Sequence, residues 1–239
     1  MIRTLHSNIR HVLHRLSTRT TMTNNIVSID ETNLIGKCIE ILKNDGVLAV
    51  PTDTIYGLAG LVRSEKAVRR IYEIKGRSFT KPLAVSVGKI DDLFLWSKPT
   101  LTKEQLSNEQ LLPGPVTLMF ERQDRLPAYF NPNVQNLAIR IPNCQFMIDL
   151  AQQLSEPIAL TSANISNDPS SISINEFQSI WPQIDLIVDG GTLASNDRRG
   201  STIVDLSERG FYHIQRYGID HQRIEFYLKE SCQLKEKSC

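Results

Sequence analysis

The sequence lacks the spacings of cysteine and histidine that are typical of metal sites. Its four cysteines form no C-x-x-C pair and its five histidines form no H-x-x-x-H pair, so we expect no zinc site and no metal-ligand set in the chain. No apolar run approaches the roughly 20 residues that a membrane-spanning helix needs, and we expect no transmembrane segment. The motifs G-x-x-x-x-G-K and G-x-G-x-x-G are also absent, so any nucleotide must be held without a Walker or Rossmann phosphate loop.

Acidic residues are missing from the first 29 residues, which carry four arginines. Apolar side chains between Ile2 and Leu16 recur on one helical face, and this combination is typical of a mitochondrial presequence. We therefore expect residues 1–25 to be a presequence, with a disordered terminus as the alternative. Translation from Met22 would give a second form, so we expect both mitochondrial and cytoplasmic localisation. A reporter fused to residues 1–30 that stayed entirely diffuse in the cytosol would reject the presequence.

The sequence also lacks a strong excess of either positive or negative charge. The formal net charge is +1, and because the first 29 residues contribute four positive charges and no negative ones, residues 30–239 carry −3. Such a body does not attract nucleic acid or nucleotides by its overall charge, so an anion site must be a local cluster of Lys and Arg. With 41% apolar residues, the chain can bury one full core, and nothing requires a second domain.

The cysteines divide into two kinds. Cys38 and Cys144 fall on the apolar faces of predicted helices, where buried free thiols are common. Cys232 and Cys239 lie in a polar tail, and we expect them to be exposed. Unpaired thiols of this kind favour a reducing compartment.

The stretch from Gly46 to Val87 carries the strongest functional signal. Its apolar run over 47–50 predicts a buried strand, and two threonines and an aspartate at 52–54 follow where that strand reaches the surface. Ligand sites in open α/β sheets gather at the carboxyl ends of strands. We therefore expect Thr52 to lie at a ligand site.

Three cations follow in the same stretch. Ser64 can cap a helix that Gly76 ends, so Lys75 and Arg77 flank the helix terminus, and Lys81 follows in the next loop. Positive side chains at a helix C-terminus often only complement the helix dipole. Three cations on one loop opposite a polar strand end, however, suit a polyanion better.

Arg140 lies inside an apolar run that predicts a strand over 137–141. A buried arginine needs an anionic partner. Either an internal salt bridge or a carboxylate or phosphate of a ligand would serve, and the residues alone leave both open.

Polar side chains recur in two further predicted strands. Thr117, in a strand over 116–120, points to the face opposite Val116 and Leu118. Residues 161–164 form a Thr-Ser-Ala-Asn turn at the end of another apolar strand, as residues 52–54 do. Taken together, the two strand ends favour a shared crevice.

The remaining pattern completes an alternation of helices and strands. We expect helices over 30–44, 90–96, 103–112, 144–154 and 174–181, strands over 83–85, 157–160, 186–188, 201–206 and 211–216, and a mobile loop over the site at 191–200.

Seven motifs of this sequence occur in the order found in one known family. The motifs are Thr-Asp-Thr-Ile-Tyr-Gly-Leu at 52–58, Lys-Gly-Arg at 75–77, Lys-Pro-Leu at 81–83, Pro-Gly-Pro-Val-Thr at 113–117, Ile-Arg-Ile-Pro at 139–142, Thr-Ser-Ala-Asn at 161–164 and Gly-Ser-Thr-Ile-Val-Asp at 200–205. Together they resemble the YrdC-like L-threonylcarbamoyladenylate synthases, in particular the short animal form, over residues 30–219.

The resemblance implies a fold and a domain plan. The fold would be α/β, a single-domain twisted mixed sheet flanked by helices, with a concave basic active-site cleft. Residues 30–219 would form the catalytic domain, and residues 220–239 a C-terminal helix and charged tail. Family members usually have Arg-Pro-Gly where this chain has Arg216, Tyr217 and Gly218, which weakens the assignment of Arg216.

The resemblance also implies a nucleotidyltransferase. Such an enzyme makes L-threonylcarbamoyladenylate from L-threonine, bicarbonate and ATP with release of pyrophosphate, the first step of N6-threonylcarbamoyladenosine formation in tRNA. Mg²⁺ would accompany ATP, and the product would pass to a tRNA threonylcarbamoyl transferase. By resemblance, Lys75 and Arg77 are the catalytic residues. The ATP-binding residues would be Lys75, Arg77, Lys81, Thr117, Ser162, Asn164 and Arg216, and the threonine-binding residues Thr52, Arg140 and Ser201.

Two other functions are compatible with parts of the pattern. A basic concave site could bind RNA without adenylate-forming activity, but no RNP-type aromatic motif and no net positive body support it, so direct tRNA binding is not expected. Carbamoyl transfer in hydrogenase maturation uses a similar domain, but those proteins carry zinc-finger and acylphosphatase-like regions that this sequence lacks.

Overall fold

The structure, a computed structural model, describes residues 25–194 and 197–237 of the chain. The predicted presequence therefore lies outside the described residues apart from Asn25, and Cys239 lies outside them as well. No helix within the described ranges is long and apolar enough to cross a membrane.

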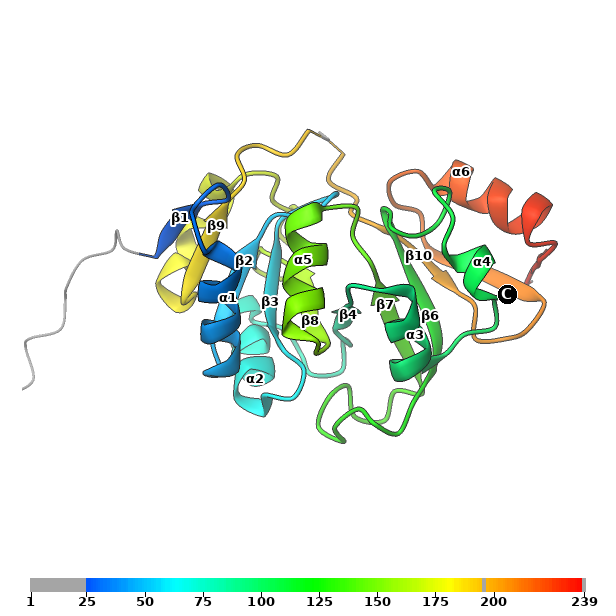
Figure 1. Cartoon of the computed structure of the whole chain (residues 1–239), viewed down its shortest axis with the longest axis horizontal. Helices are drawn as coiled ribbons and strands as arrows, with labels where there is room; N and C mark the ends of the chain where they lie inside the picture. The colour runs from blue at the N-terminus through cyan, green and yellow to red at the C-terminus, as the bar shows by residue number, and fades with distance from the viewer. Residues whose placement is uncertain (1–24, 195–196, 238–239) are drawn as a thin grey trace, which may run out of the picture.

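A mixed β-sheet runs through the whole molecule (Figure 1). Its strands follow the order β1-β9-β2-β3-β8-β4-β7-β6-β10-β11-β12, with β5 paired to β6 beside this path. The strands are β1 Ile26–Ser28, β2 Val47–Val50, β3 Gly57–Leu61, β4 Ala84–Ser86, β5 Ser97–Lys98, β6 Val116–Arg122, β7 Asn136–Arg140, β8 Ile158–Ser162, β9 Leu186–Asp189, β10 Thr202–Asp205, β11 Phe211–Arg216 and β12 Lys235–Glu236. Parallel pairs join β4 to β7 and β6 to β10, while β3 pairs antiparallel with β2 and β8.

Helices pack on both faces of this sheet. They are α1 Leu34–Lys43, α2 Glu65–Lys75, α3 Ile90–Trp96, α4 Lys103–Leu106, α5 Gln145–Leu154 and α6 His221–Phe226, with a 3-10 segment η1 Ile174–Gln183 and a π-helical turn η2 Tyr227–Ser231. In Figure 1, α1 and α5 lie side by side over β2, β3 and β8, and their apolar residues form one cluster with Leu48 and Val50. Because successive strand residues point to opposite faces, Val47 and Ala49 join the cluster of α2 instead. The predicted twisted mixed α/β sheet flanked by helices is confirmed.

The boundaries of α2 follow the predicted capping residues. The Ser64 hydroxyl accepts a hydrogen bond from the Ala67 amide, which satisfies a backbone donor at the start of the helix. Gly76 ends the helix at a φ of 56°, a left-handed conformation that glycine adopts without a steric penalty. These two residues fix where the chain leaves α2 and therefore where Arg77 begins the next loop.

Several sequence-based predictions about elements were wrong. The helix expected over 103–112 ends at Leu106, and the helix expected from residue 30 begins at Leu34 with Asn33 as its N-cap. Strand β3 was not anticipated.

The C-terminal tail also differs from the prediction. Cys232 is buried rather than exposed, because the turn η2 folds back and Cys232 joins Tyr227 and Leu228 in the core. Strand β12, which follows, pairs with the outer edge of β11. Part of the expected charged tail is therefore built into the sheet.

Candidate active site

One face of the sheet is covered by α1 and α5 at one end and opens into a cavity beyond them. Leu160 of β8 belongs both to the α1–α5 cluster and to the wall of this cavity, whose volume is about 430 Å³. Strand alternation supplies the floor: Val116 and Leu118 are buried in the core, whereas Thr117 and Met119 line the cavity. A cavity of this size falls in the range of small-molecule sites.

Eight of the ten predicted site residues line this cavity. They come from four strands and three loops and are Thr52, Arg77, Lys81, Thr117, Arg140, Ser162, Ser201 and Arg216. The remaining two, Lys75 and Asn164, lie behind Ser162. The structure thus brings together residues that are up to 164 positions apart in the chain, Thr52 and Arg216.

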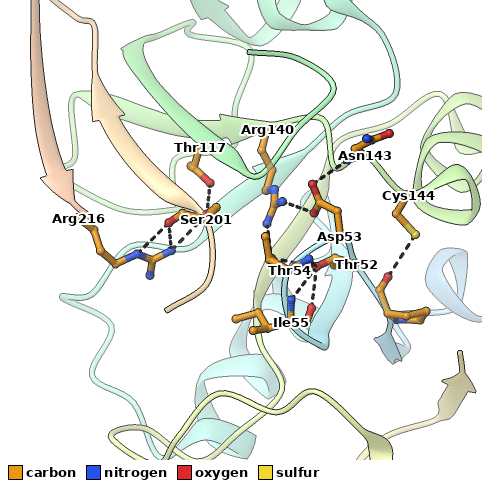
Figure 2. A network of polar contacts seen from close by, with 11 residues as sticks. Thr52, Asp53, Thr54, Ile55, Thr117, Arg140, Asn143, Cys144, Ser201 and Arg216 are labelled. Carbon is orange, nitrogen blue, oxygen red and sulfur yellow. Dashed lines mark hydrogen bonds and ion pairs between the residues drawn. The ribbon is translucent and has the colours of Figure 1, made fainter. Parts of the chain in front are cut away.

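The Thr52 hydroxyl organises the turn after β2. It donates to the carbonyl oxygen of Ile55 at 2.7 Å and accepts from the amide of Thr54 at 3.1 Å (Figure 2). Such side-chain bonds to the local backbone fix tight turns. The side chain is only 5% exposed, so it meets the cavity through a small surface.

Arg140 has an internal anionic partner. Its Nη2 atom lies 2.5 Å from Oδ1 of Asp53, and both side chains are less than a tenth exposed. The other oxygen of Asp53 accepts from the backbone amide of Asn143 at 2.9 Å. Of the two possibilities left open by the sequence, the internal salt bridge is present. The guanidinium still lines the cavity, and its Nε has no hydrogen-bond partner among the described residues.

A second polar cluster faces Arg140 across the cavity. The Ser201 hydroxyl lies 2.8 Å from that of Thr117, and Nη2 of Arg216 donates to the carbonyl oxygen of Ser201 at 2.7 Å and to its hydroxyl at 3.2 Å (Figure 2). Burial, together with the charge of Arg140, lowers the pKa of Arg216. Both guanidiniums line the cavity, so an anion bound there would be attracted by two positive charges.

The loop after α2 brings two more cations to the rim. Arg77 donates through Nη1 to the hydroxyl of Thr161 at 3.2 Å and through Nη2 to the carbonyl oxygen of Pro82 at 3.1 Å. Its Nε has no partner among the described residues, and burial lowers its pKa. Lys81 is exposed and also lines the cavity.

Lys75 lies beneath the cavity rather than in its wall. Its side-chain amine is 2% exposed and donates to the carbonyl oxygens of Ser162 and Asn164 and to the side-chain oxygens of the same two residues, at 2.6–3.2 Å. These bonds hold the end of β8 and orient Ser162. The sequence anticipated that Lys75 and this strand end lie together, but not that the amine is enclosed by four oxygens.

The charge of Lys75 gives a pH-dependent stability. Burial and, to a lesser extent, the charge of Arg77 lower its pKa to about 7, whereas the unfolded chain keeps a pKa of about 10.4. Between these values the unfolded chain binds the additional proton, so the free energy of unfolding should rise with pH, by up to about 1.4 kcal/mol per pH unit. In Lys75→Met this contribution should be missing. Urea unfolding of both proteins between about pH 7 and pH 10 measures the difference in slope, and parallel slopes would show that Lys75 keeps its proton.

Two residues of the site were not predicted from the sequence. Asp53 was noticed only as part of a polar strand end, although a carboxylate there and an arginine within an apolar run together signal a buried pair. Tyr56 is fully buried, and its hydroxyl donates to the Gly191 carbonyl at 2.8 Å and accepts from the Gly190 amide at 2.9 Å. It fixes the start of the segment that leads from β9 to β10.

Comparisons with known proteins identify a family. Residues 40–218 match the sequence profile of the Sua5/YciO/YrdC family, described as "Telomere recombination". The chain is 44% identical over 191 residues to threonylcarbamoyl-AMP synthase of Mus musculus, covering 78% of this chain and 68% of that protein. The synthase of Pyrococcus abyssi is 29% identical over 190 residues, covering 79% of this chain and 55% of that protein.

Solved structures show the same fold. The crystal structure of P. abyssi Sua5 complexed with L-threonine matches with a TM-score of 0.78 at 27% identity, covering 89% of this chain and 62% of that one. E. coli YciO matches with a TM-score of 0.72 at 22% identity, covering 84% of this chain and 98% of that one. The chain belongs to the Sua5/YciO/YrdC family.

Proposed function

We propose that this protein synthesises L-threonylcarbamoyladenylate from L-threonine, bicarbonate and ATP and releases pyrophosphate. The observation that carries the proposal is the cavity itself, where eight of the residues expected for this reaction meet. Relatives at 44% identity are named threonylcarbamoyl-AMP synthase, and a structural relative was crystallised with L-threonine. Both support this reaction over RNA binding.

The reaction needs positioning rather than a protein nucleophile. Bicarbonate takes up a proton and loses water to give carbon dioxide; the neutral amine of threonine forms an N–C bond to it and releases a proton. An oxygen of the resulting carbamate then forms a bond to the α-phosphorus of ATP. The bond from that phosphorus to the bridging oxygen breaks, and pyrophosphate leaves with the electron pair. Preorganised cations can stabilise the charge that develops on the leaving group.

The residues divide into two groups around the reacting atoms. We assign the triphosphate to Arg77, Lys81 and Arg216, with Thr117, Ser162 and Asn164 completing the nucleotide site. Lys75 supports this site from beneath through Ser162. We assign the binding of threonine and its carbamate to Thr52, Arg140 and Ser201. The guanidinium of Arg140 lines the cavity, and its charge is balanced by Asp53.

Mg²⁺ is assigned to the substrate rather than to the chain. Among the described residues no group of three or more His, Cys, Asp or Glu could hold a metal ion, and no carboxylate is among the described residues that line the cavity. Mg²⁺ commonly binds through substrate phosphates and water. We therefore propose that it enters as the MgATP complex and neutralises charge on the phosphates.

Pyrophosphate release tests the proposed function. Purified protein should release pyrophosphate only when ATP, threonine and bicarbonate are all present, and omission of any one of them should reduce release to background. Release from ATP alone, or none in the complete mixture, would reject the proposal. Adding a tRNA threonylcarbamoyl transferase and tRNA should convert the product to threonylcarbamoyladenosine, which tests the proposed hand-over.

A further inference from the structure

The loop of residues 76–83, here called the cation loop, carries Arg77 and Lys81 to the cavity, and residues 78–82 are all exposed. Arg77 bonds to Thr161, and the ring of Phe79 packs on that of Tyr72, with centroids 4.5 Å apart. Within the loop the Lys81 amide donates to the Ser78 carbonyl at 3.1 Å. Exposed residues with few apolar contacts are weakly fixed, so the contacts at the far end of the loop contribute to the position of Lys81.

Asn131, in the loop between β6 and β7, contacts the end of the cation loop. Its Oδ1 accepts from the Leu83 amide at 2.9 Å and its Nδ2 donates to the Leu83 carbonyl at 2.9 Å. One side-chain amide thus satisfies both backbone groups of Leu83, as a neighbouring strand would. Asn131 is 3% exposed and Leu83 is 1% exposed, so water cannot readily replace these bonds.

Tyr72 of α2 joins the same contact from the other side. Its hydroxyl lies 3.1 Å from the Lys81 carbonyl oxygen and 3.4 Å from Oδ1 of Asn131. The single hydroxyl proton is shared between these two acceptors. The backbone of Lys81 is therefore tied to α2 and to Asn131 together.

Asn131 is itself held against β6. Its φ is 49°, a conformation that asparagine adopts more readily than most residues. Nη1 of Arg122, at the end of β6, donates to the carbonyl oxygens of Phe130 at 2.9 Å and Asn131 at 3.1 Å. Strand β6 also carries Thr117 in the cavity wall. A chain of bonds thus connects one wall of the cavity with the loop on its rim.

We infer that Asn131, assisted by Tyr72, is a positioning residue for the ATP phosphates: it sets the distance between the cations of the cation loop and the rest of the nucleotide site. This inference rests on the proposed function. Catalytic groups need placement to within about 0.5 Å, and a shift of about 1 Å can reduce a rate about 100-fold. Asn131 touches no reacting atom and acts through Leu83 and Lys81.

The test compares Asn131→Ala and Tyr72→Phe with Asn25→Ala. Asn25 is a matched control because its amide also bonds to backbone carbonyls, those of Trp181 and Ile184, beside β9. Asn131→Ala should raise the KM for ATP about tenfold or more, and Tyr72→Phe about two- to tenfold, since one net hydrogen bond is at stake. The KM for threonine should change less than about twofold in both variants, and Asn25→Ala should leave both values near those of the wild type.

Hydrogen exchange gives a readout that does not depend on activity. The amides of Lys81 and Leu83, both hydrogen-bonded, should exchange about tenfold or more faster in Asn131→Ala, while those of β8 keep wild-type rates. Equal changes in both KM values, or unchanged exchange in the cation loop, would overturn the inference even if the wild type is active. A wild type that releases no pyrophosphate would instead refute the proposed function, and the exchange measurement would still decide whether Asn131 fixes the loop.

Discussion

Replacement of Asp53 by alanine should lower the free energy of unfolding by about 3–5 kcal/mol, because removing one partner of a buried ion pair leaves an uncompensated charge. The Arg140 side chain is 7% exposed and that of Asp53 is 8% exposed. The same change also leaves the Asn143 amide without its acceptor. Denaturation with urea measures the loss. The KM for threonine should rise as well, because Arg140 would no longer be held in one orientation.

The exposed pair between Lys98 and Glu121 provides the control for this experiment. Its side chains are 52% and 56% exposed, so Glu121→Ala should change the unfolding free energy far less than Asp53→Ala does. A double variant, Asp53→Asn with Arg140→Met, removes both charges and should recover part of the stability. If Asp53→Ala were as stable as Glu121→Ala, water in the cavity would be solvating Arg140. The buried ion pair would then contribute no more to the free energy of unfolding than an exposed one.

Arg77→Ala should lower kcat/KM for pyrophosphate release by about 30- to 1000-fold, which corresponds to about 2–4 kcal/mol of transition-state stabilisation. Arg77 lines the cavity with its guanidinium, while its buried Nε has no hydrogen-bond partner among the described residues. Its hydrogen bonds within the protein go to Thr161 and Pro82, at the surface of the cavity. The free energy of unfolding should therefore change little in Arg77→Ala. Lys75→Ala, by contrast, should lower it, because four oxygens would lose their donor.

Arg63 offers a matched arginine outside the cavity. It is exposed, is paired with Glu156 and lies over the ring of Trp96. Arg63→Ala should keep wild-type kcat/KM. Wild-type pyrophosphate release by Arg77→Ala would remove Arg77 from the catalytic assignment, and a similar loss in both variants would point to a general electrostatic effect.

Much of the sheet could be predicted because its strands are short apolar runs with clear ends. Strands β2, β6 and β7 were expected within two residues of their observed bounds. The capping residues of α2 were also identified, since Ser64 and Gly76 act through local chemistry. Local signals of this kind need no knowledge of the rest of the chain.

Elements that depend on distant partners were missed. Strand β3 has the sequence Gly-Leu-Ala-Gly-Leu, which contains no β-branched residue and has a low strand propensity. It is extended because it pairs with β2 on one side and β8 on the other. Burial of Cys232 likewise follows from the fold of η2 onto the core. The strands that pair with β3 and the core residues that cover Cys232 cannot be identified from the local sequence.

The candidate site shows the same division. The positions of Thr52, Thr117 and Ser162 at one cavity followed from strand ends and from the resemblance. The partners of Arg140 and Lys75 did not, because a buried cation only signals that some oxygen is near. Asp53 and the carbonyl oxygens of Ser162 and Asn164 are brought to these cations by tertiary packing.

The short strand β12 has a consequence for how the molecule meets its surroundings. Its backbone occupies the outer side of β11. There the backbone amides of Lys235 and Lys237 donate to the carbonyl oxygens of Gly210 and Tyr212. A strand left open there would offer unpaired backbone groups as a template for self-association. Residues 235–237 thus cover this edge of β11, and their deletion should leave its backbone groups open to association between copies.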